Sequence, residues 1–371
     1  MNQAMPDYSS LKRRYVGLDI FRIISFVGVC AFHTTIHLGA YYGILQSMSL
    51  MGAVFMTAFF LLSGYSLFIN NASKNLIDMH SLKPFWIKRA IGIMPMYYIT
   101  AILYILFNYW LKVIVQKGGY SILDEILLAP IELLAIQSNF CSLFNFSHNG
   151  GTWFISCILM CYLVYPLLQE VIKQLSIRMK AILILLSMGI LFYAPFIVNR
   201  YQTASIYANS FFRILEFSIG VMLASLKPTF DNIKQIRKYV YHWVVAFIAV
   251  VIMVYGVTWA VRRGIWVGDY MLYSRICLPC FIVMLIVLSG VESKILSESK
   301  LIAYASGISY TFFRAQLFSN TICQIIIRNV GITSNKWIIA LGWCICTIIA
   351  IVLHEGIEKP IKHYFRKKWN V

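Results

Sequence analysis

The residues best suited to chemistry lie in an apolar stretch near the N-terminus. Asp19, Arg22, His33 and His37 stand there among hydrophobic side chains. Since an α-helix turns by about 100° per residue, Arg22 and His33 share one helix face, about 16 Å apart along the axis. A guanidinium can hold an anion, and an imidazole, which titrates near neutral pH, can take a proton from an attacking hydroxyl. This pattern predicts a functional site built on one helix.

Asp19 and His37 extend the same face by one turn in each direction. We expect Asp19 to orient or neutralise Arg22. His33 and His37 have the spacing of two zinc ligands, but the glutamate of the His-Glu-x-x-His motif does not accompany them, so we predict no metal site. Two interpretations stay open for the histidines, namely proton transfer and hydrogen bonds that bridge helices.

Four more charged residues interrupt apolar stretches, namely Arg213, Glu216, Arg275 and Arg314. Each would cost on the order of 3 kcal/mol at the centre of a lipid-facing helix. We therefore expect them to face the interior of a bundle, to pair with one another or to line a wet cavity. Arg213 and Glu216 are three residues apart, which lets them pair. Packing by such pairs is the alternative to a role in binding.

The elements that must position these residues are membrane-spanning helices. Of the 371 residues, 60% are hydrophobic and 12% are charged, too few charges for a soluble surface. Apolar runs of about 20 residues match the thickness of the hydrocarbon core. We predict an all-α transmembrane helical bundle of about ten spans and one domain, residues 1–371, without a separate soluble domain. The runs are 16–40, 49–69, 90–111, 152–169, 181–199, 209–226, 239–260, 270–290, 302–327 and 337–356.

The net charge of +18 follows a topological pattern. With ten spans, both termini and the even-numbered connections lie on one side, which carries about three times as many Lys and Arg residues as the other. The positive-inside rule therefore predicts that both termini are cytoplasmic, and the same charges suit anionic lipid headgroups. This distribution argues against nucleic-acid binding.

The longest connection, residues 112–151, lies on the opposite side in this topology. Its apolar part, 122–136, has the composition of a helix lying in the membrane interface. Its end, residues 145–153, is polar, aromatic and rich in glycine. That segment fits either a loop that admits a sugar or a turn entering the fourth span.

Several short motifs occur in a fixed order along the chain. They are Leu18-Asp19 with Arg22 and His33, Phe59-Phe-Leu-Leu-Ser63-Gly64-Tyr65, Arg89 with Pro95, Trp153 with Tyr162 and Pro166, Phe212-Arg-Ile-Leu-Glu-Phe-Ser-Ile-Gly220, Ile308-Ser309-Tyr310 and Ile357-Glu358-Lys-Pro360. Together they resemble the membrane-bound acyltransferase 3 family, whose members O-acylate exported polysaccharides, lipopolysaccharide, peptidoglycan and small molecules. At three positions where many members carry Arg, Glu or His, this chain has Gly92, Ile158 and Gln316.

The resemblance implies an O-acetyltransferase in the bacterial cytoplasmic membrane that uses acetyl-CoA as acyl donor, with no permanently bound cofactor. Arg22 and Arg89 would bind the donor, and His33 would act as general base or carry the acyl group, assisted by Asp19. The acceptor would be a polysaccharide or a lipid-linked oligosaccharide. Three points stay open, namely whether transfer is direct or passes through an acyl-enzyme relay, which acyl group is moved, and whether the protein forms oligomers. Residues expected to bind substrate or assist are Ser63, Trp153, Arg213, Glu216, Arg275, Tyr310, Arg314 and Gln316.

Two other functions fit the same composition. A polysaccharide or small-molecule transporter or flippase would also have about ten spans and buried charges, without acyl chemistry. A sensory or scaffold membrane protein would use the buried charged pairs for packing alone. We find no inverted repeat with broken helices, which is typical of many transporters.

Overall fold

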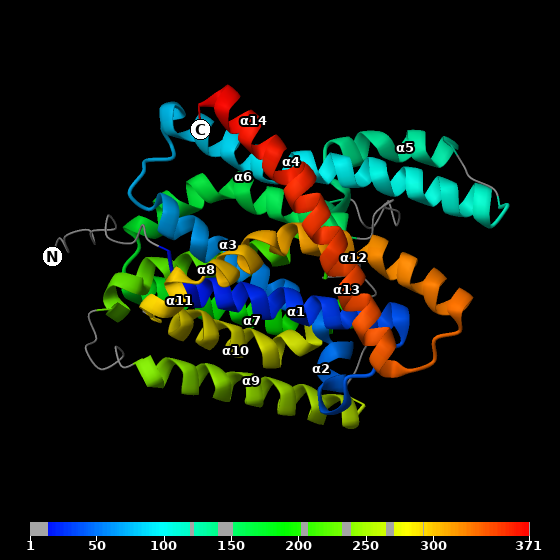
Figure 1. Ribbon diagram of the computed structural model, residues 1–371. Coiled ribbons are helices and arrows are strands. Elements are labelled where there is room, and N and C mark those ends of the chain that lie inside the picture. The colour runs from blue at the N-terminus through cyan, green and yellow to red at the C-terminus, as the bar shows by residue number, and fades with distance from the viewer. Residues whose placement is uncertain are drawn as a thin grey trace.

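The computed structural model describes residues 14–118, 122–139, 151–201, 207–231, 239–264, 271–291 and 293–370. These residues form helices joined by short connections, and no strand occurs among them (Figure 1). The prediction of an all-α fold is therefore confirmed.

Each of the ten apolar runs coincides with a long helix in the described part of the chain. The short elements include three 3₁₀ turns, η2 (Gly43–Leu45), η3 (Gly52–Val54) and η5 (Gln137–Asn139), two π-helical turns, η4 (Trp110–Val115) and η7 (His354–Glu358), and the helices α2 (Gln46–Leu50), α5 (Ile122–Leu133), α11 (Lys294–Glu298) and α14 (Lys359–Trp369). The long helices are α1 (Val16–Leu38), α3 (Phe55–Asn71), α4 (Met79–Tyr109), α6 (Thr152–Gln174), α7 (Ile177–Tyr201), α8 (Ser210–Asp231), α9 (Tyr239–Arg262), α10 (Met271–Ser289), α12 (Lys300–Val330) and α13 (Asn335–Leu353).

Within the described ranges, seven helices are long and apolar enough to cross a membrane, which identifies a multi-pass membrane protein. They are α1, α3, α4, α6, α7, α9 and α13 with its continuation. The predicted spans at α8, α10 and α12 form helices as well. α8 and α12 are more polar because they carry buried groups such as Arg213 and Arg314, and the apolar part of α10 is short.

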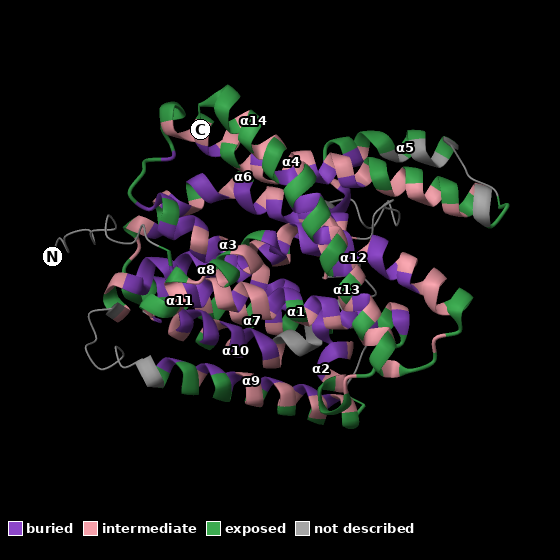
Figure 2. Ribbon diagram, in the orientation of Figure 1, coloured by how far each residue is buried: buried purple, intermediate pink, exposed green. Residues whose placement is uncertain are grey.

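The centre of the bundle is the contact between α3 and α8. A Cβ added to Gly64 would lie 2.0 Å from the carbonyl oxygen of Phe217, and one added to Gly220 would lie 2.1 Å from that of Leu61. Small residues on both helices thus let the two backbones approach closely, as in other membrane bundles. Figure 2 shows the buried residues concentrated around this pair, whereas the described part of α5 is largely exposed and α9 has an exposed face.

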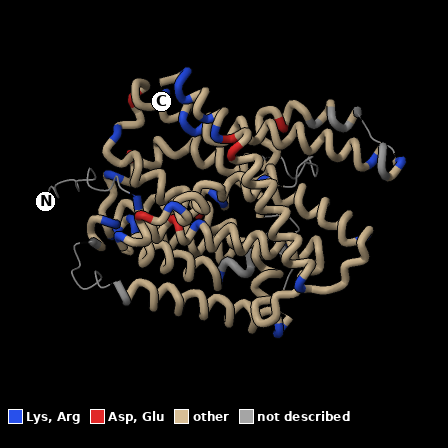
Figure 3. The backbone as a smooth tube through the Cα atoms, in the orientation of Figure 1, with Lys and Arg blue, Asp and Glu red and all other residues tan. Residues whose placement is uncertain are grey.

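α1 packs beside α12, and both helices run in the same direction. Near their starts, Arg22 donates a hydrogen bond to Ser306, and near their ends Gln324 donates one to the carbonyl oxygen of His37. Positive charge gathers at the end of the bundle that holds the start of α1, and along α14 (Figure 3). We call this end of the bundle the basic end.

The connection before α6 is described in part. The predicted interfacial segment forms a helix, α5, as expected, while its place in the interface stays a prediction. The polar segment 145–153 falls mostly outside the described residues. The described chain resumes at Gly151, and Trp153 belongs to the first turn of α6.

Candidate active site

A cavity of about 310 Å³ opens between α1, α3, α4, α6, α12 and α14 at the basic end. Four of the residues predicted to form the site line it, namely Arg22, Ser63, Arg89 and Tyr310. These side chains come from four different helices. The structure therefore brings together residues that lie as far as 288 positions apart in the chain.

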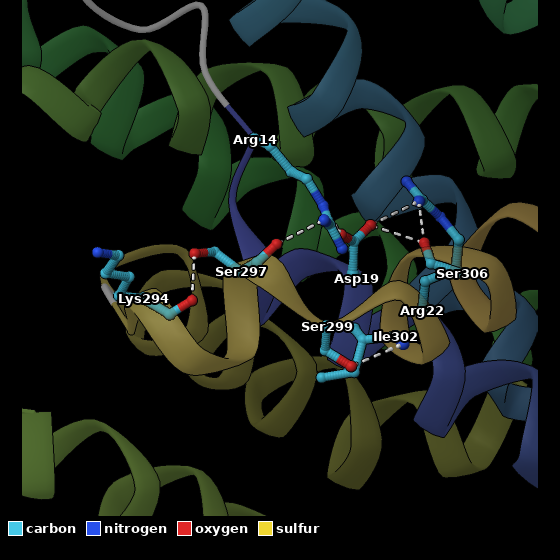
Figure 4. A network of polar contacts seen from close by, with 8 residues as sticks. All are labelled: Arg14, Asp19, Arg22, Lys294, Ser297, Ser299, Ile302 and Ser306. Atoms are coloured by element: carbon cyan, nitrogen blue, oxygen red, sulfur yellow. Dashed lines mark hydrogen bonds and ion pairs between the residues drawn. The ribbon is translucent and has the colours of Figure 1, made fainter.

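Arg22 is held by a small polar network at the wall of this cavity (Figure 4). Its guanidinium donates to Ser306 Oγ at 2.7 Å, and Ser306 in turn donates to Asp19 at 2.7 Å. Asp19 lies 3.5 Å from Arg22 but 2.7 Å from Arg14, which also bonds the carbonyl oxygen of Ser297. The expected Asp19–Arg22 contact is present, yet the closer partner of the carboxylate is Arg14.

This arrangement leaves much of the charge of Arg22 available to a ligand. Its side chain is 29% exposed, and it lines both the main cavity and a second one of about 420 Å³ that also contacts Arg14 and Asn70. A guanidinium with spare donors and access to open space is well suited to an anionic ligand. Arg22 thus stands between two hollows at the basic end.

Arg89 lies against aromatic rings on the opposite wall of the cavity. Its guanidinium carbon is 6.0 Å from the ring centre of Phe85 and 5.8 Å from that of Tyr162. The Tyr162 hydroxyl shares a hydrogen bond of 3.2 Å with Ser63 Oγ. The buried Nε of Arg89 has no hydrogen-bond partner among the described residues. This guanidinium is positioned by stacking and keeps donors for a ligand.

Three further cations at the mouth of the cavity were not singled out from the sequence. They are Lys88 of α4 and Lys362 and Arg366 of α14. A single carboxylate, Glu358, accompanies them in the lining and is bonded to Lys362 at 2.5 Å. In the sequence, only a spacing of four residues, which places Lys362 and Arg366 on one helix face, distinguishes them within a basic tail. The other basic residues of this tail do not line the cavity.

His33 does not line the cavity. Its ring stacks on that of His37 at 5.5 Å, and its buried Nδ1 has no hydrogen-bond partner among the described residues. Gly28 of α1 packs against the ring of Phe55, because a Cβ added to this glycine would touch the ring. Phe55 precedes Met56, which lines the cavity, so Gly28 marks the level along α1 at which this end of the cavity lies. Since His33 is five residues beyond Gly28, it lies about 7–8 Å further along α1 than this end of the cavity.

Buried polar groups on α12 lie at the level of His33. Gln324 of α12 is hydrogen-bonded to His37 of α1, and the two helices run in the same direction. Asn320 and His33 each lie four residues earlier on their helix, so they lie beside one another. Asn320 Nδ2 and both amide atoms of Gln316 are buried without a partner in the described part. Such groups are rare in folded proteins. Gln316 was predicted from the sequence as a site residue. Asn320, one turn further along the same face, was not predicted.

Arg213, Glu216 and Trp153 form a separate cluster. Arg213 and Glu216 are 1% and 0% exposed and pair at 2.8 Å, and Glu216 also accepts from Thr57 at 2.8 Å. The guanidinium carbon of Arg213 lies 5.3 Å from the Trp153 ring and 4.9 Å from the Tyr207 ring. Pairing was predicted for Arg213 and Glu216, and none of the three residues singled out from the sequence lines the cavity.

Arg314 and Arg275 are also satisfied within the protein. Arg314 donates to Thr100 Oγ1 and faces the Tyr97 ring at 6.0 Å. Arg275 donates to the carbonyl oxygen of Phe192 and lies 4.2 Å from the Phe196 ring. Neither lines the cavity. All six charged residues found in the apolar stretches therefore have polar or aromatic partners, as the cost of charge in lipid requires.

The fold and the site together define a multi-pass membrane protein with a cation-lined cavity and, further along α1, a buried histidine. A family model for an acyltransferase domain matches residues 15–355. The chain therefore belongs to the acyltransferase 3 family, and its class is that of membrane acyltransferases. No curated protein and no solved structure matches it.

Proposed function

We propose that this protein moves an acetyl or other short acyl group from acyl-CoA to a hydroxyl of an exported polysaccharide or of its lipid-linked precursor. The proposal includes ten membrane spans, cytoplasmic termini and a place in the bacterial cytoplasmic membrane. The observation that carries it is the cation-lined cavity at the basic end, with Arg22 in its wall and, further along the same helix, His33, whose buried Nδ1 has no hydrogen-bond partner among the described residues.

The donor binds at the basic end in this proposal. The guanidinium groups of Arg22 and Arg89 come from opposite walls of the cavity, and each keeps donors free within the described residues. Guanidinium groups bind phosphate through paired, charge-assisted hydrogen bonds. Asp19 acts as a positioning residue, because its bond to Ser306 fixes the hydroxyl that holds Arg22.

The acceptor hydroxyl is proposed to lie at His33. The imidazole takes the hydroxyl proton as the oxygen attacks the thioester carbon, the carbon–sulfur bond breaks, and the proton passes to the departing thiolate. The Nδ1 of His33, which has no hydrogen-bond partner among the described residues, supports this role. The amide of Gln316 and the Nδ2 of Asn320, which lack partners in the same part of the chain, offer bonds to further sugar hydroxyls. A transient acyl-histidine is compatible with the same groups.

The thioester has to travel from the cavity to His33. The deep end of the cavity is lined by Phe59, Phe154 and Phe313, whose rings contact one another in sequence at 6.4 and 5.5 Å. In this proposal these rings move aside when the pantetheine arm enters. All three side chains are partly buried rather than fully enclosed, and their rotation is the movement that the proposal requires.

The test is the incorporation of label into the acceptor. The purified protein receives radiolabelled acetyl-CoA and the glycan that its host exports, and the wild type is compared with Arg22→Ala and His33→Ala. We expect acylated glycan from the wild type and at least a hundredfold loss in His33→Ala, since general acid–base catalysis contributes about 10²–10⁴-fold. Arg22→Ala should also lose incorporation, because it lacks a guanidinium that binds the donor. Full incorporation by a folded His33→Ala protein would refute the mechanism.

A further inference from the structure

The C-terminal helix α14 forms one side of the cavity mouth. It continues α13 through the π-helical turn η7 and packs against α4 (Figure 1). Lys362 and Arg366 of α14 line the cavity together with Lys88 and Arg89 of α4. Two helices from distant parts of the chain thus present cations to the same opening.

Glu358 fixes the place of α14 relative to the cavity. This carboxylate is 1% exposed and lies at the end of η7. It accepts hydrogen bonds from Thr311 of α12 and from Lys362, and it bonds the ring of His354. π-helical turns interrupt α-helices at functional positions more often than elsewhere. Here the turn places a buried anion where it holds Lys362 of α14.

The positively charged side chains at the mouth of the cavity outnumber the carboxylates that could neutralise them. Glu358 is occupied by Lys362, and it is the only carboxylate in the described lining of the cavity. Lys88, Arg89 and Arg366 have no carboxylate partner among the described residues. Positive charges gathered around a narrow opening are unfavourable unless a multivalent anion is present to offset them.

We propose that α14 is the phosphate-binding wall of the acyl-donor site, with Lys362 and Arg366 facing Lys88 and Arg89 across the phosphates. The proposal rests on the proposed acyl-CoA chemistry and adds residues that this chemistry does not require. The diphosphate and the phosphate monoester of CoA lie at the end of the molecule away from the thioester. A monoester alone carries about −1.5 to −2 charges at neutral pH. Phosphates held at the mouth direct the thioester inward, past Arg22.

The positions of the basic residues around α14 distinguish phosphate binding in the cavity from simple attraction to the membrane. Lys362 and Arg366 are four residues apart and share the face of α14 that lines the cavity, whereas Lys367 does not line it. Phosphate groups of lipids offer the same chemistry as those of the donor. We favour the soluble donor because the cavity-facing pair, rather than the outward lysine, meets the cations of α4.

The experiment measures binding of CoA to the purified full-length protein in nanodiscs of neutral phosphatidylcholine. Arg366→Gln is the main variant, because its side chain has no polar partner in the described structure, and Lys362→Gln is the second. Lys367→Gln removes the same charge from a position of α14 that does not line the cavity, and it serves as the matched control. We expect at least tenfold weaker CoA binding for Arg366→Gln and Lys362→Gln, and a change below twofold for Lys367→Gln.

Acetyl-pantetheine, which lacks the nucleotide and its phosphates, gives the second readout. Wild type and Arg366→Gln should use it with equal kcat/KM, since the lost contacts are to phosphate. Unchanged CoA binding in Arg366→Gln and Lys362→Gln would overturn the role of α14 while leaving the acyltransferase proposal intact. An effect that Lys367→Gln shares, or that occurs only in nanodiscs with anionic phosphatidylglycerol, would overturn it too. A wild type that binds no CoA would refute the donor itself.

Discussion

Gly92 offers a way to fill the cavity without disturbing the packing of helices. It lies in α4 and lines the cavity, and a Cβ placed there would meet nothing within 4 Å. Gly92→Leu adds four carbon atoms to this space. At about 30 Å³ each, similar to a water molecule in the liquid, they occupy roughly 120 Å³. More than a third of a cavity of about 310 Å³ is lost.

The expected result is a folded protein that no longer admits its donor. A misplacement of about 1 Å can cost about 10²-fold in rate, so we expect kcat/KM for acetyl-CoA to fall at least a hundredfold. Leucine is a better helix former than glycine by about 1 kcal/mol, and the melting temperature should therefore not decrease. The assay is the release of free CoA by purified protein, with thermal unfolding measured on the same samples.

Gly189 provides the matched control. It is an exposed glycine of α7, its Cβ position is equally open, and it does not line the cavity. Gly189→Leu should keep wild-type kinetics. Gly92→Leu with undiminished kcat/KM and normal stability would refute donor binding in this cavity.

Three further results are expected from single substitutions. Arg14→Gln removes the closer partner of Asp19, whose charge then turns to Arg22, so KM for acetyl-CoA should rise severalfold in steady-state kinetics while kcat changes little. Glu216→Gln leaves a buried guanidinium unpaired, which should lower the free energy of unfolding by about 3–5 kcal/mol. Gln316→Leu removes amide atoms that lack partners, so the melting temperature should hold or rise. The same variant should raise KM for the glycan, and an unchanged KM would exclude Gln316 from acceptor binding.

Much of this site follows from the spacing of residues within single helices. Arg22 and His33 share a face of α1 because 11 residues make slightly more than three whole turns, and that spacing is independent of the rest of the fold. The cost of charge in lipid likewise demanded partners for Arg213 and Glu216. Local periodicity and burial cost are properties of the sequence itself.

Contacts between distant segments could not be predicted in the same way. Arg14 precedes the first helix, and its bond to Asp19 depends on how the chain enters the bundle. The return of Arg366 to the cavity depends on the π-helical turn η7, for which the sequence gives no periodic signal. The distance of His33 from the cavity depends on η3, which seats α3 against the middle of α1. These features come from packing between elements.

The most direct test of the central claim is the release of CoA from acetyl-CoA by the purified protein in the presence of its glycan, compared between wild type and His33→Gln at saturating donor. The mechanism predicts steady release by the wild type and a rate at least a hundredfold lower for His33→Gln, with acetyl-CoA binding unchanged because His33 lies outside the cavity. Equal rates in the two proteins, or glycan movement across the membrane without any release of CoA, would contradict it.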